Sequence, residues 1–100
     1  MRINKDILWD SRIENIYDVL SAVKHRKILS GIFFICVDKK GVIQILSCLQ
    51  IYKDINSPND LKAIAAAKGK VSAFEMLARI YSEYCKKHGS IEGISDYYKY

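Results

Sequence analysis

Residues 28–52 read ILSGIFFICVDKKGVIQILSCLQIY, an apolar stretch that is interrupted once, at Asp38-Lys39-Lys40-Gly41. This interruption is typical of a type I turn followed by a glycine in the left-handed conformation, which commonly joins two antiparallel strands. The residues on either side are rich in β-branched and aromatic side chains, as strands prefer. The stretch therefore predicts a β-hairpin that folds back at Gly41.

A second interpretation of the same stretch is a pair of buried helices. Gln44, Ser47 and Gln50 recur every three residues with apolar residues between them, and this period is helical. A helix that began at Val42, however, has no capping residue, and Gly41 weakens its first turn. We therefore prefer the hairpin and keep the helices as the alternative.

Two helices are predicted on either side of this stretch from their start and stop signals. A Ser-x-x-Glu capping box at residues 11–14 precedes apolar residues at helical spacing, which predicts a helix over residues 11–26. A serine and a proline at residues 57–58 suit the cap and the first position of a helix, and Gly69 suits its end. They predict a second helix over residues 57–69.

A third helix is predicted over residues 72–88. Another capping box starts it, and Gly89 follows as its stop signal. Its predicted buried face consists of Phe74, Leu77, Ala78, Tyr81, Tyr84 and Cys85.

These elements predict a single small α+β domain over residues 1–100, in the order helix, β-hairpin, helix, helix. One hundred residues suit one domain, and a hydrophobic share of 50% with a single proline is typical of an ordered globule. Because two strands are not stable alone, the hairpin must pack against the helices. The alternative fold is an all-α bundle of four to five helices.

The cysteines and the apolar stretches indicate where in the cell the protein is located. Cys36, Cys48 and Cys85 are odd in number and show neither CxxC nor Cys/His ligand spacing, so we expect reduced thiols and no zinc site. No signal-peptide pattern occurs, and the uncharged residues 28–37 are too few to cross a bilayer. We expect a cytoplasmic protein without a membrane partner.

Catalytic motifs are missing from the sequence. It has no glycine-rich phosphate loop, no Gly-x-Ser-x-Gly, no HExxH and no EF-hand pattern. His25 and His88 lie in runs of Lys and Arg, so we expect neither catalysis nor metal binding from them. We expect no enzyme and no cofactor. A small ribonuclease, in which Tyr98 transfers a proton and Arg26 stabilises charge, is a third hypothesis.

The net charge of +5 is compatible with an anionic partner. If the fold brings the basic clusters together, nucleic acid is the partner they fit. The candidate residues are Lys24, Arg26, Lys27, Lys39, Lys40, Lys68, Lys70 and Arg79.

Residues 57–88 have the predicted layout of a helix-turn-helix DNA reader, whose second helix enters the major groove. The exposed early positions of that helix would be Ala73, Glu75 and Arg79, of which only Arg79 suits guanine. A basic nucleic-acid-binding regulator is therefore the alternative function, and an ordinary pair of packed helices is the simpler interpretation of this segment.

Protein–protein contact is the leading functional hypothesis. Both faces of the first hairpin strand are apolar, so we expect part of that surface to stay uncovered in a monomer. Its candidate residues are Phe33, Phe34, Ile35 and Val37, which would bind a protein partner or a second copy in a homodimer. The sequence thus predicts a small non-enzymatic regulator, adaptor or immunity-type inhibitor.

Overall fold

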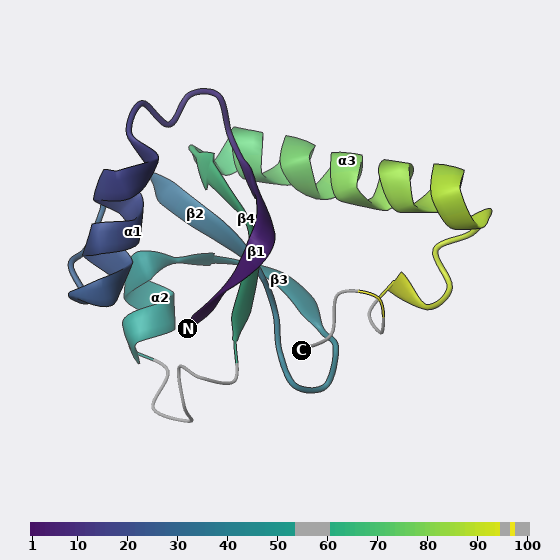
Figure 1. Cartoon of the computed structure of the whole chain (residues 1–100), viewed down its shortest axis with the longest axis horizontal. Coiled ribbons are helices and arrows are strands. Elements are labelled where there is room, and N and C mark those ends of the chain that lie inside the picture. Colours follow the sequence, from purple (N-terminus) through teal and green to yellow (C-terminus); the bar gives the residue numbers. More distant parts are fainter. Residues whose placement is uncertain (54–60, 95–96, 98–100) are drawn as a thin grey trace.

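A four-stranded sheet with helices on both faces forms the molecule (Figure 1). The computed structural model describes residues 1–53, 61–94 and Tyr97. The predicted α+β fold class is confirmed, and the alternative all-α bundle is wrong. In chain order the elements are β1 (Arg2–Trp9), α1 (Ile16–Lys24), β2 (Ile32–Val37), β3 (Ile43–Ser47), α2 (Cys48–Lys53), β4 (Lys62–Lys68) and α3 (Lys70–His88).

The predicted hairpin is present, because β2 and β3 pair in antiparallel register. The Asp38 carboxylate accepts hydrogen bonds from the backbone N–H groups of Lys40 and Val42, each at 2.9 Å. Gly41 adopts a φ of 84°, a conformation that side chains disfavour, which explains a glycine at this position. The helical period of residues 44–50 belongs in part to α2, which begins directly after β3.

β4 lies inside the sheet, between β1 and β2, in the order β1-β4-β2-β3. It runs parallel to β1 and antiparallel to β2. The prediction of a helix over residues 57–69 is therefore wrong for residues 62–68, and residues 57–60 lie outside the described residues. Helices cover both faces of β4. Strands buried on both faces are typically continuous uncharged runs, as residues 63–67 are here. Four alanines in it are fully buried: Ala63, Ala65, Ala66 and Ala67.

Each face of the sheet carries its own hydrophobic core. On one face Phe34 of β2 packs with Val19 of α1 and Ile51 of α2. On the other face Ile35 packs with Ile80 of α3. Figure 1 shows α1 and α2 on one side of the sheet and α3 on the other. Because side chains alternate along a strand, both faces of β2 are apolar and both are covered.

Both long helices begin at other residues than predicted. Asn15 caps α1, since its side chain accepts hydrogen bonds from two backbone N–H groups of the first turn, so Ser11 is not the cap. α3 begins at Lys70 and not at Ser72. Its end is as predicted, because Gly89 terminates it in the left-handed conformation.

α3 also turns a different face to the sheet than predicted. Its buried residues are Ser72, Ala73, Met76, Ile80 and Tyr84. Only Tyr84 of the predicted buried face is among them. The rest of that face, including Phe74 at 55% exposure, is exposed or half-buried.

Candidate functional site

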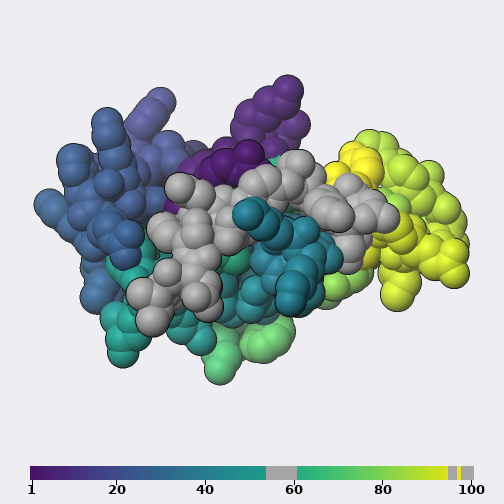
Figure 2. Space-filling view, turned by 90° about the horizontal axis from the view of Figure 1, so that it is seen from below, coloured from purple at the N-terminus to yellow at the C-terminus, as the bar shows by residue number. Residues whose placement is uncertain are grey.

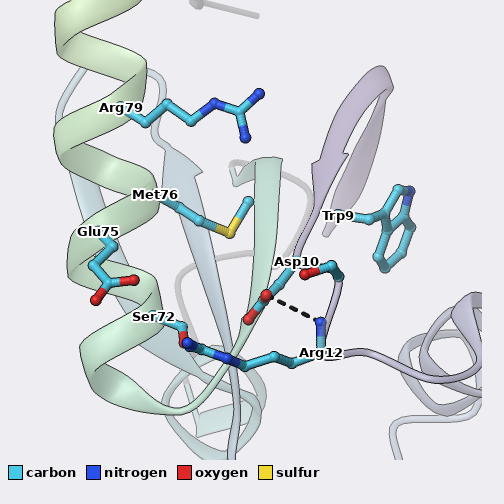
Figure 3. Close-up of a pocket in the computed structure, with 8 residues that line it drawn as sticks. Trp9, Asp10, Arg12, Ser72, Glu75, Met76 and Arg79 are labelled. Atoms are coloured by element: carbon cyan, nitrogen blue, oxygen red, sulfur yellow. Dashed lines mark hydrogen bonds between the residues drawn. The ribbon is translucent and has the colours of Figure 1, made fainter.

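A polar pocket lies where the parallel strands β1 and β4 end and α3 begins (Figure 3). Its volume is about 310 Å³. Ligands often bind at the carboxyl ends of parallel strands, beside the start of the next helix, so this location makes the pocket the first candidate site. It is lined by Trp9, Asp10, Ser11, Arg12, Ser72, Glu75, Met76 and Arg79.

Asp10 is the centre of a hydrogen-bond network in this pocket. Its Oδ1 accepts from the Arg12 backbone N–H at 3.1 Å, and its Oδ2 accepts from the Lys68 backbone N–H at 2.9 Å. The Arg12 guanidinium also donates to the Ser72 hydroxyl. Burial by itself would raise the pKa of Asp10, but the hydrogen bonds from Lys68, Arg12 and Ser72 and the charge of Arg12 outweigh it. The pKa of Asp10 is therefore held below its usual value.

The chemistry of the network favours a structural role. A carboxylate with a lowered pKa is a weak general base, and both oxygens of Asp10 are engaged by backbone groups. None of the eight lining residues is a histidine or cysteine that could act with the Ser72 hydroxyl. Arg79 forms an ion pair with Glu83 at 3.0 Å. The network joins the end of β1 to the start of α3.

Within residues 1–53 and 61–94 and at Tyr97, no group of three or more His, Cys, Asp or Glu side chains is arranged to hold a metal ion.

Three of the four residues predicted to bind a partner lie in the core. Phe34, Ile35 and Val37 are each 0% exposed, which contradicts their assignment to an exposed surface. The physical reason is that β2 is an inner strand with helices on both of its faces. Phe33 is half-buried and packs at the margin of the α3-side core.

The predicted anion-binding residues of the hairpin turn and of the end of β4 do not meet on one surface. Lys39 and Lys40 lie in the hairpin turn, at the end of the sheet where β4 begins. Lys68 ends β4, and Lys70 begins α3 beside it. The seven residues of β4 separate these two pairs by about 20 Å, at about 3.3 Å per residue. Arg79 lies further along α3 and is paired with Glu83.

The remaining basic residues lie where α1 ends. Lys24, Arg26 and Lys27 are exposed there, and Figure 2 shows α1 and the hairpin turn as separate parts of the surface. The Arg26 guanidinium donates to the carbonyl of Tyr52 at 2.9 Å and lies 5.4 Å from the centre of its ring. Arg26, which lies just after the end of α1, thus links this part of the chain to α2. Tyr98, its suggested partner in a ribonuclease, lies outside the described residues.

The helix-turn-helix prediction is wrong for the described part of residues 57–88, because a strand, β4, precedes α3. Ala73, expected to face DNA, is fully buried against the sheet.

α3 carries a second apolar row besides the one that packs on the sheet. Residues at spacings of three and four lie on one flank of a helix, and this pattern is the one through which helices pair. Val71 is 71% exposed, Phe74 is 55% exposed and Ala78 is exposed. The last two members are half-buried, and one of them, Tyr81, also packs against the core on this face of the sheet. We call this row the α3 stripe: Val71, Phe74, Ala78, Tyr81 and Cys85.

The α3 stripe lies on the flank of α3 that faces away from β1. The opposite flank carries Glu75 and Arg79, which line the polar pocket together with Trp9 of β1. Since α3 packs on β4 and β2, its flank away from β1 looks toward β3. There Ile43 and Ile45 are half-buried on the same side of the sheet as α3. Ile43 and Ile45 of β3 and Tyr81 of the stripe all pack against the core on this face of the sheet.

Sequence reasoning found these stripe residues but assigned most of them to the core. The signal that could have corrected this is that α3 has a second row at helical spacing, through Ala73, Met76, Ile80 and Tyr84. This second row packs with Ala65 and Ala67 of β4 in the core on that face of the sheet.

Besides the polar pocket, the molecule has an apolar groove between α1 and the edge strand β1. It has a volume of about 390 Å³. Its polar members, Asn4 and Lys5, interrupt the apolar lining. Tyr17, at 81% exposure, is its most exposed large hydrophobic member. We call it the β1 groove, and it is lined by Ile3, Asn4, Lys5, Ile7, Trp9, Ile16, Tyr17 and Leu20.

The chain matches no protein-family model, and no curated protein or solved structure is significantly similar to it. Among the helices in the described ranges, none combines the length and apolarity needed to cross a lipid bilayer.

Proposed function

We propose that this chain is a non-enzymatic binding module that acts through protein–protein contact at the α3 stripe. The single observation that carries the proposal is the exposure of Val71 and Phe74 on a helix flank whose apolar residues recur at pairing spacing. The polar pocket offers no comparable site, because its central carboxylate is occupied by the backbone of the chain itself.

The exposed area determines how strong such a contact can be. Fully burying a valine or phenylalanine contributes about 1.5–3 kcal/mol, so the exposed fractions of Val71 and Phe74 correspond to about 2–4 kcal/mol together. Association costs at least about 4 kcal/mol in lost freedom of motion, so these two residues do not suffice alone. The rest of the stripe and β3 must contribute. We expect a weak contact, with Kd between about 1 μM and 1 mM.

Site-specific photo-crosslinking tests the proposal. p-Benzoyl-phenylalanine is placed at position 74 in one variant and at position 17 in a control, because both Phe74 and Tyr17 are exposed aromatic residues. Irradiation of cells that express the chain should give a discrete cross-linked product from position 74 and none from position 17. Absence of any product from position 74 overturns the proposal. A product from position 17 alone assigns the contact to the β1 groove and also overturns it.

The alternative function, nucleic-acid binding, has less support. The basic pairs in the hairpin turn and at the end of β4 lie at opposite ends of the sheet. A duplex follows a continuous basic surface, because each phosphate contact adds to affinity by releasing counterions. The arrangement of these lysines therefore favours protein contact as the function.

A further inference from the structure

We infer that the partner at the α3 stripe is a second copy of this chain, with the two α3 helices paired antiparallel. This inference rests on the proposed function and names its occupant. Two observations carry it: the spacing of the stripe and the sizes of its residues.

The spacing of the stripe fits a short helix pair. Its five residues follow one another at intervals of three, four, three and four, as in the seam of two paired helices. From Val71 to Cys85 the stripe is about 21 Å long, at 1.5 Å per residue. Tyr97, the described residue nearest the end of the chain, lines a pocket with Asn4 and Leu8 of β1. Its ring also lies 5.4 Å from the rings of Tyr84 and His88, near the end of α3.

The residue sizes are complementary only when the helices run antiparallel. In the layers of such a pair, Phe74 lies opposite Cys85 of the second copy, and Ala78 lies opposite Tyr81 of the second copy. The two-fold axis that relates the copies generates the same two contacts again, with the roles of the two copies exchanged. Each aromatic ring thus meets a small side chain, which allows the two helices to approach closely. In a parallel pair Phe74 would face Phe74 and Ala78 would face Ala78, which crowds one layer and leaves a gap in the next.

The residues beside the seam distinguish the antiparallel pair from a parallel one. Glu75 follows Phe74 and borders the seam on the side of α3 that leads to the polar pocket. The antiparallel arrangement places it opposite Ser82 of the second copy, one turn from Lys86. Neither Glu75 nor Lys86 forms an ion pair with another described residue. In a parallel pair, position 82 would instead face the other flank of the seam, near Leu77 of the second copy.

Charge changes at Ser82, which is exposed, test this arrangement. Ser82→Lys places an ammonium group opposite Glu75 of the second copy, and the two-fold axis makes this attractive contact twice. Ser82→Glu creates two repulsive contacts at the same places. Ser82→Lys raises the charge of each copy from +5 to +6, and Ser82→Glu lowers it to +4, so general repulsion between copies predicts the opposite order of affinities. The order of the affinities of the two variants therefore distinguishes the antiparallel contact from the effect of net charge.

Sedimentation equilibrium from about 10 μM to 1 mM gives the Kd of each variant. We expect Ser82→Lys to tighten self-association about threefold to tenfold and Ser82→Glu to weaken it by a similar factor. The double variant Glu75→Lys/Ser82→Glu should recover tight association, because its charges are exchanged.

Two results overturn the inference. If the wild type self-associates but the two Ser82 variants are equal or in reverse order, the antiparallel pairing of α3 is wrong. If the wild type stays monomeric throughout the range, the second copy is not the partner. In that case a cross-link from position 74 to a different protein leaves the proposed function standing, and its absence removes both.

Discussion

Replacing Asp10 with asparagine should destabilise the fold through the network at the start of α3. The carboxylate has an acceptor for each of two backbone N–H groups, those of Arg12 and Lys68. An asparagine of the same shape has only one acceptor, so its NH₂ group must face the other N–H group. The substitution therefore loses one hydrogen bond to a charged acceptor and places two donors against each other.

The size of the loss follows from the surroundings of Asp10. A hydrogen bond to a charged group contributes about 1.5–3 kcal/mol, and the partial exposure of Asp10 places the loss toward the lower end of that range. We expect the free energy of unfolding to fall by about 2 kcal/mol. For a domain of this size the melting temperature would fall by about 8–16 °C.

Urea and thermal unfolding followed by circular dichroism measure this change, with Asp6→Asn as the control. Asp6 is an exposed carboxylate on β1, the strand that Asp10 follows, and no hydrogen bond joins its side chain to another described residue. Equal stabilities of Asp10→Asn and Asp6→Asn would refute the reasoning.

The pH dependence of the difference provides a second check. The pKa of Asp10 in the folded state lies below its ordinary value of 3.8. Its stabilising effect is therefore fully present above pH 3.8 and is lost as the pH falls through the folded-state pKa. The stability difference between wild type and Asp10→Asn should shrink below pH 4. A difference that stayed constant to pH 2 would show that the charge of Asp10 is not its source.

Three further substitutions or reactions test other parts of the structure. Asn15→Ala removes the cap of α1 and should lower the free energy of unfolding by about 1 kcal/mol in urea titrations, whereas a loss below about 0.3 kcal/mol would contradict the capping role. Gly41→Ala forces a side chain into a φ of 84° and should cost about 1 kcal/mol or more in the same assay; an unchanged midpoint would argue against this turn. Burial raises the pKa of Cys36 to about 12, so at pH 8 a thiol reagent followed by mass spectrometry should modify the half-buried Cys85 well before Cys36, and equal rates would count against the buried position of Cys36.

The parts of the fold that the sequence predicts correctly are those with local signals. The hairpin follows from Asp38 and Gly41, because one supplies a side-chain acceptor for the turn and the other tolerates its positive φ. The end of α3 follows from Gly89 for the same conformational reason. These signals act within a few residues, so neighbouring elements do not alter them.

β4 could not be predicted in the same way. Residues 62–68 contain four alanines, and alanine has the highest helix propensity, so a local argument favours a helix. The structure makes them a strand because β1 and β2 supply hydrogen-bond partners on both sides and helices cover both faces. These partners come from residues 2–9 and 32–37, which a local pattern does not include.

The exposure of the α3 stripe could not be predicted from the sequence for a related reason. A helix that packs over the alanines of β4 can approach the sheet closely only with small or flexible side chains, which Ala73 and Met76 of α3 supply. Phe74 lies on a different side of α3 from these two residues and remains 55% exposed. Periodicity alone ranks the two rows of α3 by hydrophobicity and assigns the aromatic row to the core. Because the row through Ala73, Met76, Ile80 and Tyr84 makes the contact with the sheet, the aromatic row is left exposed or half-buried, and it is the stripe through which we propose that the chain binds.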